Sequence, residues 1–279
     1  MFVEARDGTL LYYTDWGNGP PIVLIHGWPL SSAMWEYQAS ALVQAGHRVV
    51  AYDRRGFGRS AQPWDGYDYD TFADDLAAVI EELDLREVTL VGFSMGGGEV
   101  ARYLSRHGPD RIARAVLVSS VTPFLLAAPD NPDGVDRSVF DEMLQSLGED
   151  RPAFLSSFGN TFFGTSMLDF SVSSEMMDWA KMIALQASPA ATTACVHAFS
   201  ETDFRPDMAA FTVPTLIIHG DADETVPLSS SSRIAARMIP DAQLVVYAGG
   251  SHALFAMQKD RLNGDLLAFV GARGRMLRA

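Results

Sequence analysis

The sequence predicts an α/β protein with a mostly parallel β-sheet and helices on both faces. Short apolar runs alternate with stretches of helical periodicity over most of the 279 residues, which is typical of parallel strands joined by crossover helices. A glycine-rich segment around Ser94 separates one such strand from one such helix. One longer segment, 122–209, breaks the alternation and is rich in Pro, Phe and Met.

Eight strand-like runs are expected. Asp7-Gly8 is typical of a hairpin turn between the first run and the second run at 9–13. The other six runs are mainly apolar, as expected for strands covered on both faces. They are 22–25, 48–52, 88–91, 115–118, 215–218 and 244–247.

Helices are expected between these strands. The clearest covers 72–83, where apolar residues recur every 3.6 residues and acidic residues occupy the other face. Thr71 and Asp74 have the spacing of a capping box at its start. Further helices are predicted at 34–45, 95–107 and about 255–270.

This alternation divides the chain into a core, 1–121 with 210–279, and a helical lid insertion, 122–209. The insertion is expected to pack over one end of the sheet. Its many aromatic and Met side chains hold the insertion together, and a minority of them are expected to line an apolar pocket between lid and sheet.

Composition excludes several classes of function. The chain has 35 acidic and 21 basic residues and a net charge of -14, which argues against binding to nucleic acid or anionic membranes. A single cysteine, Cys195, excludes an internal disulfide framework and a thiolate metal cluster. No apolar run reaches the ~20 residues of a membrane span, and charged residues near Met1 argue against a signal peptide. We expect a cytoplasmic enzyme or small-molecule binder.

The strongest chemical signal is Gly92-Phe93-Ser94-Met95-Gly96, which matches G-x-S-x-G between a strand and a helix. A sharp strand-to-helix turn strains its central residue, and glycines on either side allow the close approach of neighbouring backbone. Ser94 is therefore predicted to project its Oγ at the carboxyl end of the sheet, beside the N–H groups of a helix start.

A serine nucleophile needs an adjacent base. In this type of fold the triad follows the order Ser, acid, His, so the base must follow both Ser94 and an acid. Of the six histidines, His252 in the loop 249–252 satisfies this order, whereas His219 precedes the acid candidates.

The acid is expected in the loop after the strand at 215–218, where it would orient the imidazole. Spacing alone does not choose between Asp221 and Asp223. The competing interpretation is a metal site of these two residues with His219. No further ligand cluster is apparent, so we expect no metal and no cofactor.

The oxyanion hole requires two N–H donors. One is expected from Met95, the residue after the nucleophile, and the other from the loop at 26–29. Pro29 has no N–H, which leaves Trp28 as the candidate.

These residues resemble the α/β-hydrolase family. Within it the chain is similar to the cofactor-free bacterial haloperoxidases, also called perhydrolases, and to the related arylesterases. The similarity runs over nearly the whole chain. The matching stretches are 26–29, 53–60, 69–75, 92–103, Phe199, 201–204, 219–223 and 226–227.

The resemblance implies that Ser94 is the nucleophile, His252 the base and Asp223 the acid, with the oxyanion N–H groups as assigned above. It implies ester hydrolysis through an acyl-enzyme. It also implies that a carboxylic acid and hydrogen peroxide form a peracid, which oxidises halide without heme or metal. Two segments depart from the family pattern: Ser251-His252-Ala253 replaces Pro-His-Gly, and 124–130 matches poorly.

An apolar pocket would suit substrates with a small or medium acyl group, including aryl esters. The predicted pocket residues are Trp28, Pro29, Phe93, Val121, Phe124, Phe158, Phe162, Phe199 and Val226. Pro29 motivates a sharper hypothesis, in which it restrains Trp28 so that the Trp28 carbonyl accepts a hydrogen bond from peroxide. The alternative is a rigid loop with no such selectivity.

Other functions share these residues. A lactam or amide hydrolase, a lactonase or a carbon–carbon hydrolase would use the same triad. Haloalkane dehalogenases and epoxide hydrolases are disfavoured because their elbow nucleophile is Asp. The non-catalytic alternative is a hydrolase-like protein that binds an apolar ligand. The expected partners are small esters or carboxylic acids, with peroxide and halide; relatives of this kind often form homo-oligomers.

Overall fold

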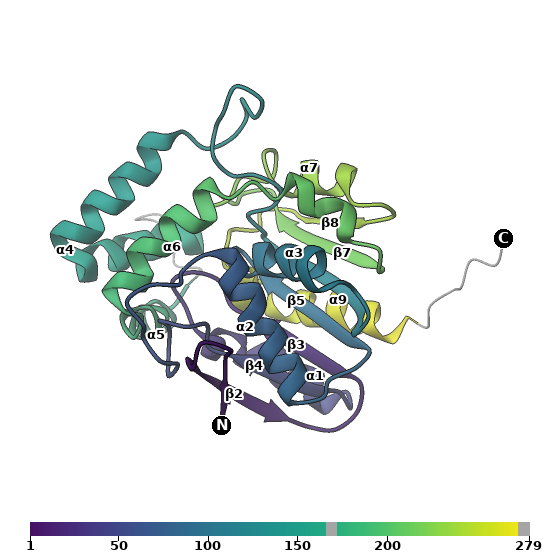
Figure 1. Ribbon diagram of the computed structural model, residues 1–279. Helices are drawn as coiled ribbons and strands as arrows, with labels where there is room; N and C mark the ends of the chain where they lie inside the picture. The colour runs from purple at the N-terminus through teal and green to yellow at the C-terminus, as the bar shows by residue number, and fades with distance from the viewer. Residues whose placement is uncertain (166–171, 273–279) are drawn as a thin grey trace.

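The computed structural model describes residues 1–165 and 172–272, so 166–171 and 273–279 of the predicted insertion and core lie outside the described part. An eight-stranded sheet with the order β1-β2-β4-β3-β5-β6-β7-β8 forms the core (Figure 1). The pairings of β2 with β1 and with β4 are antiparallel, and the other pairings are parallel. The predicted α/β class with a mostly parallel sheet is confirmed.

The strands lie where the apolar runs predict them, with ends that differ by a few residues. Their central members are buried because helices cover both faces. Their bounds are β1 Phe2–Glu4, β2 Leu10–Trp16, β3 Pro21–Ile25, β4 Arg48–Tyr52, β5 Val88–Phe93, β6 Ile112–Val118, β7 Thr215–Gly220 and β8 Gln243–Tyr247.

The helices of the core pack in pairs: α1 contacts α9, and α2 contacts α3. Figure 1 shows α2 and α3 in front of the sheet and α9 behind it. The bounds are α1 Glu36–Gln44, α2 Tyr69–Glu82, α3 Met95–His107, α7 Ser232–Met238, α8 Leu254–Met257 and α9 Lys259–Gly271.

Two helix predictions need correction. Helix α2 begins at Tyr69, and Asp68 caps it by accepting the Thr71 N–H at 3.0 Å, so the capping box at Thr71 was wrong. Asp68 has extended backbone geometry and a carboxylate that reaches the third N–H of the helix. The predicted C-terminal helix is divided in two at Gln258, whose φ of -126° and ψ of 36° are not helical.

Three α-helices of the described residues lie between β6 and β7, and we call them the cap helices. They are α4 Arg137–Phe163, α5 Ser174–Leu185 and α6 Pro189–Glu201. Figure 1 shows them gathered at one side of the molecule. Helix α4 is kinked, because Asp150 is not helical and Pro152 follows it. Within 1–165 and 172–272, no helix combines the length and apolarity needed to cross a bilayer.

Candidate active site

Ser94 lies at the turn between β5 and α3, with φ +53° and ψ -118°. This strained conformation is the one predicted from the glycine-rich motif. The flanking glycines are required by close packing: a Cβ on Gly92 would lie 2.4 Å from the Gly96 carbonyl oxygen, and one on Gly96 would lie 2.6 Å from the Ile25 carbonyl oxygen. The turn therefore directs Ser94 toward the carboxyl ends of the strands.

A chain of hydrogen bonds joins Ser94 to two residues from distant parts of the sequence. His252 Nε2 lies 3.0 Å from Ser94 Oγ, and His252 Nδ1 lies 2.7 Å from Asp223 Oδ2. All three side chains are buried. An imidazole held between a hydroxyl and a carboxylate is the arrangement that lets a serine lose its proton during attack on a carbonyl.

Three donors hold Asp223, and His219 lies close to it. Oδ1 accepts the backbone N–H groups of Thr225 at 3.0 Å and Val226 at 2.8 Å, and Oδ2 lies beside His252 and His219. Burial is the largest single influence and raises the pKa of Asp223. The two histidines together lower it by more, so the pKa of Asp223 lies below its usual range. The carboxylate therefore stays ionised to lower pH than a free aspartate.

Asp221 does not reach the histidine. Its side chain is exposed and accepts the backbone N–H of Gly249 at 2.7 Å. The geometry thus brings Asp223, rather than Asp221, to His252. Among the residues that the structure describes, no group of three or more His, Cys, Asp or Glu could hold a metal ion.

His219 is a member of this network that the sequence analysis did not assign to it. Its Nε2 lies 2.8 Å from the Val226 carbonyl and 3.1 Å from Asp223 Oδ2, and its Nδ1 lies 2.7 Å from Ser232 Oγ. A carbonyl only accepts hydrogen bonds, so Nε2 carries the proton and donates it. The spacing His219-x-x-x-Asp223 at the end of β7 is the signal that could have indicated this contact.

The two candidate oxyanion donors come from the start of α3 and from the loop after β3. Met95 is the first residue of α3, where backbone N–H groups have no partner within the helix. Trp28 follows β3, and its peptide bond to Pro29 is cis. The Trp28 indole donates to the Thr192 carbonyl in α6 at 3.0 Å and contacts the Phe158 and Phe199 rings, with centroids 5.4 and 5.6 Å away. Trp28 therefore connects the oxyanion loop with the cap helices.

A buried ion pair supports the same loop from behind. Arg54 Nε donates to Glu99 Oε2 at 2.7 Å, and another guanidinium nitrogen donates to the His26 carbonyl at 2.8 Å. The Arg54 backbone N–H also donates to His26 Nε2 at 3.0 Å. Burial raises the pKa of Glu99 well above its usual value, because a carboxylate is costly to place in the protein interior. His26, which begins the loop, is thus fixed by Arg54 on two sides.

An apolar cavity of about 310 Å³ opens above Ser94 and His252. We call it the active-site cavity. Of the predicted pocket residues, Trp28, Val121, Phe158, Phe199 and Val226 line it. The lining residues that the sequence analysis missed are Leu125, Val135, Val139, Phe140, Met143, Thr161, Glu224, Thr225 and Pro227.

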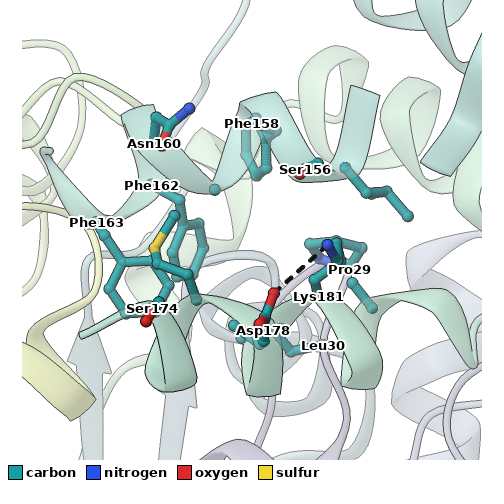
Figure 2. Close-up of a pocket in the computed structure, with 15 residues that line it drawn as sticks. Pro29, Leu30, Ser156, Phe158, Asn160, Phe162, Phe163, Ser174, Asp178 and Lys181 are labelled. Carbon is teal, nitrogen blue, oxygen red and sulfur yellow. Dashed lines mark ion pairs between the residues drawn. The ribbon is translucent and has the colours of Figure 1, made fainter. Parts of the chain in front are cut away.

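The other predicted pocket residues lie elsewhere. Phe93 is fully buried behind the imidazole, with its ring centroid 4.9 Å from that of His252. Phe124 lies under the Arg205 guanidinium, 5.1 Å from it, and lines neither this cavity nor the next. Pro29 and Phe162 line a second cavity between α4 and α5, shown in Figure 2. The pocket prediction placed these four side chains in the active-site cavity because spacing cannot tell which face of a packed segment they occupy.

Comparisons with known proteins agree with this geometry. Residues 20–256 match the model of the alpha/beta hydrolase fold family. The chain is 45% identical to a non-heme chloroperoxidase of Kitasatospora aureofaciens, over 95% of this chain and 98% of the relative. It is 39% identical to a bifunctional esterase/perhydrolase of Acinetobacter calcoaceticus, over 96% and 99%. A crystal structure of a bromoperoxidase from Bacillus anthracis superposes with a TM-score of 0.94 at 46% identity, covering 97% of this chain and 99% of that one.

Proposed function

The chain belongs to the α/β-hydrolase fold family, with non-heme haloperoxidases among its relatives, and from that premise we propose that it is a serine esterase with perhydrolase activity. The observation that carries the proposal is the hydrogen-bonded chain Ser94–His252–Asp223 beneath an apolar cavity. Relatives named for esterase, perhydrolase and haloperoxidase activity support it.

In the first half of the reaction, Ser94 Oγ attacks the ester carbonyl while His252 Nε2 accepts its proton. Asp223 stabilises the imidazolium through Nδ1. The Trp28 and Met95 N–H groups bind the oxyanion, and loss of one such donor typically costs about 3–4 kcal/mol of barrier. His252 then gives its proton to the departing alcohol, which leaves an acyl group on Ser94.

In the second half, water or hydrogen peroxide gives a proton to His252 and attacks the acyl carbon. Water releases a carboxylic acid; peroxide releases a peracid, and both restore the Ser94 hydroxyl. A free peracid can transfer its terminal oxygen to a halide ion, giving a carboxylate and a hypohalous acid. The oxidant in that step is the peracid, so no redox group of the protein takes part.

The active-site cavity favours uncharged substrates of modest size. Its lining is mainly apolar and its volume of about 310 Å³ lies at the lower end of the range of small-molecule sites, roughly 300–1,000 Å³. Glu224, which is exposed, is the only Asp or Glu among the lining residues. We therefore expect small aryl and alkyl esters to react faster than esters that carry a carboxylate.

The test of the proposed function is a labelling experiment with parallel kinetics. A fluorophosphonate probe is expected to label the wild type and not Ser94→Ala. Aryl and alkyl esters are expected to be hydrolysed, and acetate with peroxide and bromide to give brominated product. Absence of labelling would favour a protein that only binds an apolar ligand. Turnover of lactones or lactams without turnover of esters would show that the triad catalyses lactone or lactam hydrolysis instead.

The hypothesis about Pro29 has its own comparison. If Pro29 directs the Trp28 carbonyl toward peroxide, Pro29→Leu lowers the ratio of perhydrolysis to hydrolysis. An unchanged ratio would leave Pro29 as a rigid part of the loop. Use of halide, self-association and a cytoplasmic location remain proposals made from the sequence.

A further inference from the structure

The second cavity, of about 310 Å³, lies between α4 and α5 (Figure 2). We call it the α4–α5 cavity. Its interior is formed by apolar side chains from both helices and from the loop after β3. These are Pro29, Leu30, Leu155, Phe158, Phe162, Phe163, Met177, Ala180 and Ala184.

The polar side chains of the α4–α5 cavity lie toward solvent. Ser156, Asn160, Ser174 and Asp178 are exposed, and Lys181 is partly exposed. Lys181 Nζ lies 3.5 Å from Asp178 Oδ1, so the charges at the rim offset one another. An apolar interior with a neutral rim fits an uncharged group better than an anion or a cation.

The two cavities share a wall. Phe158 lines both of them. Its ring centroid lies 5.4 Å from that of Trp28 and 5.8 Å from that of Phe162. Phe162 in turn lies 4.9 Å from the His252 ring. Phenylalanine side chains of α4 therefore lie between the reacting groups and the α4–α5 cavity.

We propose that the α4–α5 cavity is a substrate subsite, which takes the apolar alkyl or aryl tail of an ester too long for the active-site cavity. A rotamer change of Phe158 joins the two spaces. Each cavity alone lies at the lower end of the range for small-molecule sites, and the two together hold a ligand of about twice the size. The inference rests on the proposed esterase function and names its substrate class.

Filling the α4–α5 cavity from α5 tests the proposal without a change at the triad. The variants are Ala180→Leu and Met177→Trp, and the readout is the ratio of kcat/KM for a long ester to that for the acetate. Two series are measured, p-nitrophenyl esters from acetate to decanoate and acetate esters from methyl to decyl, because the tail can belong to the acyl or the alcohol part. We expect the ratio to fall at least about tenfold in one series.

Removing the Phe158 side chain from the shared wall is expected to change the kcat/KM ratio in the opposite direction. Phe158→Ala is expected to raise the same ratio about tenfold, and adding Ala180→Leu to it is expected to cancel the gain. The matched control Ala153→Leu lies outside both cavities, on the exposed side of α4. It is expected to keep the ratio within about twofold.

The outcomes separate the two proposals. If the folded filling variants keep the wild-type ratio in both series, or if Ala153→Leu changes it as much as they do, the subsite is overturned. If no ester is turned over and Ser94 is not labelled, the esterase function fails instead. Thermal unfolding of each variant shows whether it is folded, and the pair of filling variants allows for the failure of one of them.

Discussion

The sheet edge and the cap helices hold their functional residues in different ways. At the sheet edge, hydrogen bonds fix Ser94, His252 and Asp223 in buried positions. In the cap helices, Phe158 and Phe199 are held by packing between aromatic rings, with centroids 5.4–5.8 Å from their neighbours. Hydrogen bonds are directional and lose their strength with small displacements, whereas packed rings tolerate replacement by side chains of similar size.

Because of this difference, we expect catalysis and substrate selectivity to change independently in the two regions. A substitution at the sheet edge is expected to affect every substrate alike, since it removes a reacting or orienting group. A substitution in the cap helices is expected to change which esters react. The following predictions test that division, beginning with the largest effect.

Ser94→Ala removes the nucleophile and is expected to lower kcat/KM for all esters by at least about 10⁴-fold. The loss is expected to be similar for short and long esters, because the missing oxygen forms the bond in each case. Initial rates on the two ester series measure it, with circular dichroism as the control for folding. A loss confined to one length of ester would contradict the division.

Asp223→Asn is expected to lower kcat/KM by about 10⁴-fold, because the amide no longer orients His252 in its reactive tautomer. Asp221→Asn is the matched control in the same loop, and a change of less than about threefold is expected since Asp221 bonds to Gly249 instead. Equal losses for the two variants would mean that the loop, rather than the carboxylate at His252, is what matters.

Arg54→Met tests the support of the oxyanion loop. It leaves the Glu99 carboxylate buried without its partner, and the free energy of unfolding is expected to fall by about 3–5 kcal/mol. Arg137→Met breaks an exposed pair with Glu201, and a loss of no more than about 1 kcal/mol is expected. Urea unfolding measures both. If Arg54→Met is as stable as the control, the buried pair does not hold this loop.

Phe199→Ala is the corresponding change on the cap side. We expect the preference for aryl over alkyl acetates to fall about tenfold, because the ring is lost from the wall of the active-site cavity and from contact with Trp28. Labelling of Ser94 by the fluorophosphonate is expected to persist. A loss of labelling would show that the cap helices determine the chemistry as well as the selectivity.

His219→Phe gives the smallest expected effect. Loss of the His219 N–H removes one of the contacts that lower the pKa of Asp223. The carboxylate is then protonated at a higher pH, and the acidic limb of the kcat/KM profile is expected to move to higher pH. His219→Gln retains a donor near the same position and is expected to restore the wild-type limb. If both variants lower the rate without a shift in pH, His219 serves stability alone.

The sheet edge could be predicted from the sequence because local pattern determines it. A strand, a glycine-flanked serine and a helix start are neighbours in the chain, so Ser94 needed no knowledge of distant contacts. Residue spacing could not decide between Asp221 and Asp223, because both lie in one loop and only the folded course of that loop directs one of them to His252. Val139 and Phe140 were missed for a related reason: the direction in which α4 faces depends on how it packs.

The bond from the Trp28 indole to Thr192 has a consequence for how selectivity is expressed. The indole of this residue contacts the cap helices, and its backbone N–H is the one that we propose as an oxyanion donor. An ester that fits poorly and displaces α6 is expected to displace the Trp28 N–H from the oxyanion as well. Such an ester is expected to have a lower kcat with little change in KM.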